Sequence, residues 1–190
     1  MGYDEKIFKA KANIKARRLW LVFAILLTAN YGTDTANGAY SVSNYIIFVI
    51  LCWLPFVCGD ILLKRKGKDN DHYRLAFVIG YGIFYVFLLC TTTSPIAFTY
   101  ILPIISLIVI FKDEKFMIYC AVANMLSLIA SIAFHIFVLG QNTAIDHKNF
   151  QLQIACLLLC YIGYIMSVRH LTESDAALTE SIKSDLNRVV

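Results

Sequence analysis

Long apolar stretches alternate along the chain with short clusters of charged residues. The apolar stretches cover residues 19–35, 42–63, 75–111, 116–139 and 150–168. As a single helix, the uncharged stretch 75–111 would be about 55 Å long, whereas a hydrocarbon core is about 30 Å thick. We expect it to fold back at the TTTSP segment 91–95, because Pro95 disfavours helix at the preceding residue. The pattern predicts an all-α, polytopic membrane bundle of about six transmembrane helices.

Composition agrees with a membrane protein that contacts the lipid bilayer. Hydrophobic residues make up 59% of the 190 and charged residues 16%, whereas a soluble domain is about 25% charged. We expect no cleavable signal peptide, because further membrane segments follow the first apolar stretch and no clean cleavage site is evident.

The basic residues predict an orientation. Of the 17 Lys and Arg residues, all except Lys148 lie in the N-terminal segment 1–18, in the loops 64–74 and 112–115, or in the tail 169–190. Six crossings place these four segments on one side, and Lys and Arg mark the cytoplasmic side. We therefore expect a multi-pass protein of the cell membrane with both termini in the cytoplasm, and with residues 19–168 as its transmembrane domain.

The two terminal segments each allow two interpretations. The basic segment 1–18 is either an interfacial helix on anionic lipid or a disordered flank. The tail 169–190 is a cytoplasmic helical linker, directed either toward a coiled coil or along the membrane surface, because apolar residues recur in it at steps of three and four. We expect the tail to be truncated in mid-helix, since no cap or breaker follows Arg188.

The motifs of common catalytic and metal sites are absent from the sequence. It contains no G-x-S-x-G, no H-E-x-x-H and no Walker loop. We expect no enzyme activity, no catalytic residue, no metal site and no cofactor, and no nucleic-acid partner, because the basic residues flank membrane helices. Asp60 precedes Lys64 by four residues, which predicts an ion pair within one helix.

One helix carries a polar stripe that offers candidate ligand-binding residues. Asn124, Ser127, Ser131 and His135 recur at steps of three and four, so they share one face that must turn away from lipid. The stripe either forms interhelical hydrogen bonds or lines a ligand pocket or proton path. A pocket would lie near His135 and the 91–95 turn. The predicted set comprises Asp34, Tyr100, Asn124, Ser127, Ser131 and His135.

Several segments resemble the membrane region of clostridial-type methyl-accepting chemotaxis proteins. They are ILCWLPF at 50–56, IGYGIFY at 79–85, TTTSP at 91–95, YILP at 100–103, QIAC at 153–156, CYIGY at 160–164 and the tail 174–190. The resemblance implies the sensory and transducing domain of a homodimeric chemotaxis receptor. In that family, the sixth helix leads to a cytoplasmic coiled coil, which carries methylated glutamates and controls a histidine kinase through a coupling protein.

The chain departs from this family pattern, because it lacks the methylation helices and the kinase-contacting tip. No methylation or kinase-binding residue can therefore be carried over, and contact with the kinase and coupling protein would require the missing downstream domain. Two alternatives stay open: the sensor domain of a membrane histidine kinase or cyclase, and a small transporter or channel. The ligand and the oligomeric state do not follow from the sequence.

Overall fold

The computed structural model describes residues 2–92 and 94–189. Met1, Thr93 of the predicted turn and Val190 lie outside the described residues. The described chain is helical without a strand, in the order α1 (Gly2–Ala36), α2 (Val42–Lys66), α3 (His72–Thr91), η1 (Ala97–Ile101), α4 (Leu102–Ile108), η2 (Val109–Phe111), α5 (Glu114–Phe137) and α6 (Ala144–Val189). The predicted all-α class is confirmed.

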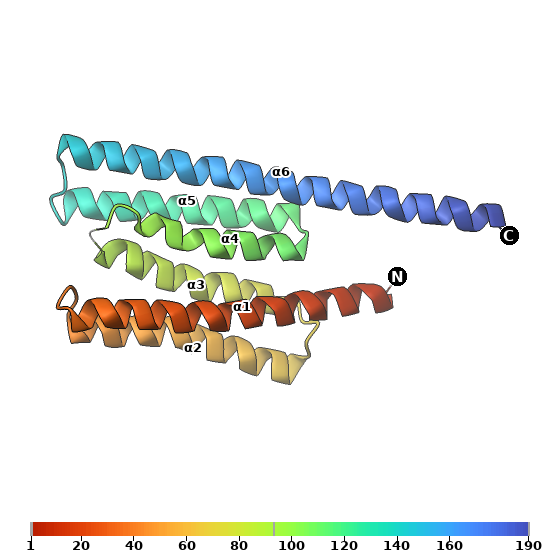
Figure 1. Ribbon diagram of the computed structural model, residues 1–190, viewed down its shortest axis with the longest axis horizontal. Coiled ribbons are helices and arrows are strands. Elements are labelled where there is room, and N and C mark those ends of the chain that lie inside the picture. The colour runs from red at the N-terminus through yellow and green to blue at the C-terminus, as the bar shows by residue number, and fades with distance from the viewer. Residues whose placement is uncertain (1, 93, 190) are drawn as a thin grey trace.

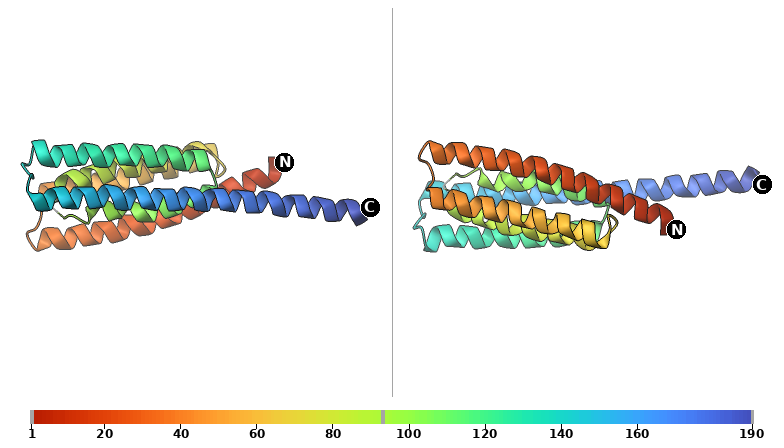
Figure 2. Two further views of the ribbon diagram at one scale, coloured as in Figure 1. Left: turned by 90° about the horizontal axis from the view of Figure 1, so that it is seen from above. Right: turned by 90° about the horizontal axis from the view of Figure 1, so that it is seen from below.

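The helices form an antiparallel bundle in which η1, α4 and η2 together make one short rod (Figure 1). The pairs α1–α2 and α5–α6 lie on the two sides, with α3 and the short rod between them (Figures 1 and 2). Both chain termini and the connections 67–71 and 112–113 lie at one end, which we call the basic end. The connections 37–41, 92–96 and 138–143 lie at the other, which we call the far end (Figure 1).

Four helices of the described chain, α2, α3, α5 and α6, are long and apolar enough to cross a membrane. Residues 97–111 form a shorter apolar segment. Its central helix α4 has a proline in the first turn and a 3₁₀ turn on either side, so the segment is not one regular α-helix. The first half of α1 is charged and its end is polar. The predicted fold-back is confirmed, since α3 ends at Thr91 and the chain reverses before Ala97.

Helix α2 is apolar on both of its faces. One face is buried in the bundle through Phe48, Cys52, Phe56, Gly59 and Leu63. The opposite face is exposed and carries large aliphatic side chains at the same helical spacing, namely Ile46, Ile50, Leu54, Val57 and Ile61. A helix of a soluble protein would carry polar residues on its exposed face, so this surface suits contact with hydrocarbon.

Aromatic rings fill the junction of the first three helices. Trp20 of α1 is almost fully buried, with its ring centroid 5.6 Å from that of Phe56 on α2 and 4.9 Å from that of Phe77 on α3. Both pairs meet edge to face, the arrangement that the ring quadrupoles favour. Trp20 therefore joins α1 to α2 and α3.

Helices α2 and α3 touch where one of them has no side chain. A Cβ added to Gly80 of α3 would lie 2.3 Å from the Cβ of Pro55 on α2. Because two carbons cannot approach that closely, only glycine allows this contact. Small residues of this kind let membrane helices pack through their backbones.

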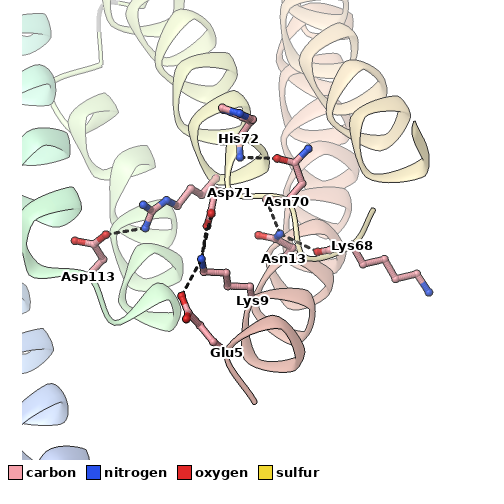
Figure 3. A network of polar contacts seen from close by, with 9 residues as sticks. Glu5, Lys9, Asn13, Lys68, Asn70, Asp71, His72 and Asp113 are labelled. Atoms are coloured by element: carbon pink, nitrogen blue, oxygen red, sulfur yellow. Dashed lines mark hydrogen bonds and ion pairs between the residues drawn. The ribbon is translucent and has the colours of Figure 1, made fainter. Parts of the chain in front are cut away.

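The N-terminal segment is a helical extension of α1, so the disordered alternative is wrong. It packs against the connection 67–71 at the basic end (Figure 3). Asn13 is buried there, and its side-chain amide donates to the carbonyl oxygens of Lys68 and Asn70, at 2.9 Å each. Lys9 pairs with Glu5 and Asp71, and these hydrogen bonds raise the pKa of the Lys9 ammonium.

Ion pairs join the other elements at the basic end. Arg17 of α1 pairs with Asp60, which also accepts the predicted contact from Lys64 at 3.7 Å. Arg74 of α3 lies 2.7 Å from Asp113, whose carboxylate also caps α5 by accepting from the Phe116 N–H at 2.9 Å. Burial alone would raise the pKa of Asp113, but the hydrogen bonds from Phe116 and Arg74 hold it below its usual value.

Helix α6 runs without a break from the far end to beyond the rest of the bundle (Figure 1). Two ion pairs hold it where it leaves the bundle, Arg169 with Glu114 and Asp175 with Lys112. Beyond them the side chains are exposed to solvent, including Leu178, Ile182 and Leu186.

The close contact of α2 and α3 predicts a sharp difference between two glycines of the same helix. Gly80→Ala should lower the free energy of unfolding by about 1–3 kcal/mol, because the added methyl group forces the helices apart. Gly82→Ala should leave it unchanged or slightly raised, since nothing lies within 4 Å of its Cβ position and alanine favours helix. Thermal unfolding in detergent measures both. Equal melting temperatures for the two variants would contradict the contact.

Candidate ligand-binding site

Tight turns at the far end bring polar side chains together from several helices. After α5, Gly140 adopts a left-handed conformation with φ of 68°, which a residue with a Cβ rarely adopts. The turn lets the Gln141 N–H donate to the His135 carbonyl at 3.0 Å. It thereby returns the Gln141 side chain to the histidine ring.

The first cavity at this end, which we call the histidine cavity, has a volume of about 80 Å³. It is bounded by α5, by the start of α6 and by the connection that follows α3. Its polar lining includes Thr92, Ser131, His135, Gln141 and Gln153.

Hydrogen bonds join α5 to the end of α3, and α6 to the connection that follows α3. His135 Nε2 lies 2.7 Å from the carbonyl oxygen of Leu89 on α3, and its Nδ1 lies 2.9 Å from Oε1 of Gln141. Because the Leu89 carbonyl can only accept, Nε2 donates this hydrogen bond. The Gln153 amide of α6 donates to the carbonyl oxygen of Pro95 at 2.9 Å.

A second cavity, the tyrosine cavity, has a volume of about 130 Å³. It lies between the end of α1, the start of α2 and the chain on either side of Thr92. Its polar lining includes Asn30, Tyr31, Asp34, Tyr40, Thr92 and Tyr100.

Aromatic stacking shapes one wall of the tyrosine cavity. The ring of Tyr31 is stacked between Tyr40, at a centroid distance of 4.4 Å, and Phe48, at 4.2 Å. The hydroxyls of Tyr40 and Thr92 are hydrogen-bonded at 3.0 Å. Thr92 and Ser94 line both the tyrosine and the histidine cavity, so the two cavities share residues of the connection that follows α3.

A third cavity, the apolar cavity, lies deeper between α3, α5 and α6 and has a volume of about 70 Å³. Asn124 lines it, and its side-chain amide donates to the hydroxyl of Tyr161 on α6 at 3.1 Å. Ser127 also lines it, but its hydroxyl donates to the Ala123 carbonyl of its own helix at 2.9 Å. The polar groups at this level are thus occupied within the protein.

The predicted site residues are therefore divided among three places. Ser131 and His135 lie in the histidine cavity, Asp34 and Tyr100 in the tyrosine cavity, and Asn124 and Ser127 in the apolar cavity. The stripe does face inward, with Asn124, Ser131 and His135 buried and Ser127 half-buried. Asn124 and His135 both form interhelical hydrogen bonds, as one interpretation expected, and a ligand pocket along the stripe stays a prediction.

The far-end cavities also contain polar residues outside the predicted site set, among them Tyr31, Tyr40, Thr92, Gln141 and Gln153. Tyrosines near the end of an apolar helix are typical of a membrane-interface belt, and Thr92 belongs to a predicted turn. Gln153 had a usable signal, because a buried amide near the start of an apolar helix needs a partner. Gln141 had none, since only the turn at Gly140 brings it to His135.

Comparison of the chain with protein-family models, with curated proteins and with solved structures found no match. Within residues 2–92 and 94–189, no cluster of three or more His, Cys, Asp or Glu side chains is arranged to hold a metal ion. The chemistry of the far end is therefore that of hydroxyl, amide, imidazole and carboxylate groups around small cavities.

The geometry predicts that alanine substitutions at two residues of the stripe on α5 lower the stability of the protein by different amounts. His135→Ala should lower the free energy of unfolding by about 2–3 kcal/mol, because it removes a buried hydrogen bond between α5 and α3 and leaves a void. Ser127→Ala should change it by less than about 0.5 kcal/mol, since that hydroxyl bonds only within its helix. Thermal unfolding of the two variants in the same detergent tests this. A His135→Ala protein as stable as the parent would show that the imidazole does not hold α3.

Proposed function

We propose that this chain is the sensory and transducing membrane domain of a receptor of the chemotaxis type. A stimulus at the far end would alter the packing of the bundle, and α6 would carry the change to the tail. The observation that carries the proposal is the continuity of α6, which lines the histidine cavity at Gln153 and extends past the basic end as one helix. The resemblance to chemotaxis receptors agrees with such a path.

The proposal includes six membrane crossings, two of which are α1, which is less apolar, and the short rod 97–111, which is apolar but shorter. Six antiparallel crossings would leave the basic end in the cytoplasm and the far end outside. All Lys and Arg residues except Lys148 belong to the basic end, and this asymmetry favours the same orientation. The short rod would cross the membrane as part of the bundle, with neighbouring helices beside it. Its first residues, 97–101, are packed against α3.

Contacts of α6 at both ends of the bundle support its role in transmission. At the far end Gln153 binds the connection 92–96, and at the basic end Arg169 and Asp175 bind Glu114 and Lys112. A change at the first contact would reach the second through an unbroken helix. Signalling requires the stimulus to favour one of two packings, since a ligand that binds both equally shifts neither.

We also propose that the tail forms a parallel coiled coil with a second copy of the chain. Exposed Leu171, Leu178 and Ile182 follow heptad-like spacing on the part of α6 that leaves the bundle. Burial of this stripe in a homodimer would remove it from water. In a dimer, one subunit could also shift relative to the other, and this displacement would be the signal that the tail transmits.

The orientation predicts which lysine reacts from outside the cell. In intact cells, a membrane-impermeant amine reagent should label Lys148, which is exposed at the far end. Lys148→Arg should abolish this labelling, and permeabilised cells should show labelling of the lysines of the basic end. Labelling of Lys68 or Lys112 in intact cells would overturn the topology.

The transducing function predicts that damage at the far end changes a cytoplasmic output. The chain can be joined through its tail, in heptad register, to the kinase-controlling part of a chemotaxis receptor. Gln153→Ala should then change the autophosphorylation rate of the kinase at least about twofold, because it frees α6 from Pro95. Gln151→Ala is the matched control, since Gln151 is exposed on the same turn of α6.

A second fusion protein shows whether the signal travels through α6. Four glycines inserted between Thr172 and Glu173 should make kinase activity independent of the residue at 153, because the helix is interrupted. Two results together would refute the function. The parent and Gln153→Ala fusions would have equal kinase activity, and a fusion with a single unrelated membrane helix would have that same activity.

A further inference from the structure

The tyrosine cavity contains a carboxylate that the protein leaves uncompensated. Asp34 lines the cavity near the end of α1. Within the described residues, the hydrogen bonds and ion pairs engage the carbonyl of Asp34 but not its carboxylate, and all ion pairs lie at the basic end. The far end has one Lys or Arg residue, Lys148, which pairs with no acid there. A half-buried carboxylate in such a place favours a cation.

The rest of the lining consists mainly of groups that can accept a hydrogen bond or contact an organic cation. The lining includes three residues with hydroxyl groups, Tyr40, Thr92 and Tyr100, two of which also carry aromatic rings. Tyr100 is also bound by the Asn30 amide, at a long 3.3 Å. An ammonium group brings several N–H donors and a positive charge, and both are suited to hydroxyl oxygens and aromatic rings.

Tyr31 gives an independent sign that the site is incomplete without a ligand. Its side chain is 4% exposed, and its hydroxyl is buried without a hydrogen-bond partner among the described residues. Nearly all buried polar groups in proteins have a partner, and one without costs about 1–3 kcal/mol. Tyr31 lines the tyrosine cavity, and its hydroxyl is closed off from that space in this structure, so a small shift of the ring would let a bound molecule supply the partner.

We propose that the tyrosine cavity binds a small organic ammonium ion, with Asp34 as its counter-ion and Tyr31, Tyr40 and Tyr100 as its aromatic and hydroxyl contacts. The volume of about 130 Å³ is close to the roughly 150 Å³ of a cavity that holds benzene. The ligand is therefore a primary or substituted amine of about four to seven heavy atoms.

This inference rests on the proposed function, because it names the class of stimulus for the same receptor. The site is also joined to the transmitting helix. Thr92 contributes to both far-end cavities, and the connection that follows it is held by Gln153 of α6. A ligand that moves Thr92 thus acts on the connection bound by α6.

Butylammonium is a suitable probe, with 1-butanol and butyrate as its neutral and anionic counterparts. The full chain in detergent, in phosphate buffer free of other amines, should show a melting temperature that rises with butylammonium concentration and stays constant with the other two. Asp34→Asn should weaken butylammonium binding at least about tenfold, because a charge-assisted contact is lost. Asp146→Asn is the matched control, since Asp146 lines the histidine cavity and caps α6.

Tyr31→Phe gives a readout that a purely structural tyrosine would not show. Without butylammonium, this variant should melt at the same temperature as the parent or higher, because the lost hydroxyl had no partner. Its affinity for butylammonium should nevertheless fall severalfold. A clear drop in the melting temperature of the free Tyr31→Phe protein would overturn the role of Tyr31 as a ligand contact.

The outcomes separate this inference from the proposed function. Equal stabilisation by butylammonium and 1-butanol, or an Asp34→Asn protein that binds butylammonium like the parent, refutes the ammonium site. Neither result alters the kinase readout of the Gln153→Ala fusion, which tests transmission alone. Conversely, selective butylammonium binding that depends on Asp34 supports the site even where the kinase fusion does not respond to Gln153→Ala.

Discussion

The free-energy cost of moving a charge from water into hydrocarbon determines where the charged residues of this protein lie. Each ion pair among the described residues lies at the basic end, where the chain termini and two connections meet. Among the same residues, the far end is held by hydrogen bonds rather than by ion pairs, such as His135 to the Leu89 carbonyl and Gln153 to the Pro95 carbonyl. Between the ends, both faces of α2 are apolar. Charged groups in hydrocarbon would be destabilised by several kcal/mol each, so the helices have room for charge only at their ends.

The same constraint changes what makes the helices fit one another. Where both faces of a helix are apolar, burial of apolar surface does not select the neighbour, because lipid is as apolar as protein. Shape then determines the packing. Gly80 admits Pro55, and Trp20 fills the space between Phe56 and Phe77. Packing that depends on shape has few alternative solutions, which suits the proposed change of the bundle between defined arrangements.

The sequence predicted what depends on hydropathy and charge, and missed what depends on neighbours. The limits of α2, the reversal after Thr91 and the gathering of basic segments at one end follow from composition along the chain. The inward direction of the stripe on α5 follows in the same way. Periodicity shows which face is buried, however, and not which helix lies opposite. Arg17 is therefore a partner of Asp60 that spacing within one helix did not reveal, and the predicted site fell into three cavities.

The length of α6 has a mechanical consequence. From Arg169, where the helix is clasped, to Val189 the rod extends about 30 Å at 1.5 Å per residue. A tilt of about 5° around that clasp moves the end of the rod by about 3 Å, although the helix near the clasp moves by only a fraction of an ångström. A small tilt at Arg169 is thus converted into a larger displacement of the C-terminal end of α6. Side chains in the bundle can stay within their packing contacts while the C-terminal end of α6 is displaced by about 3 Å.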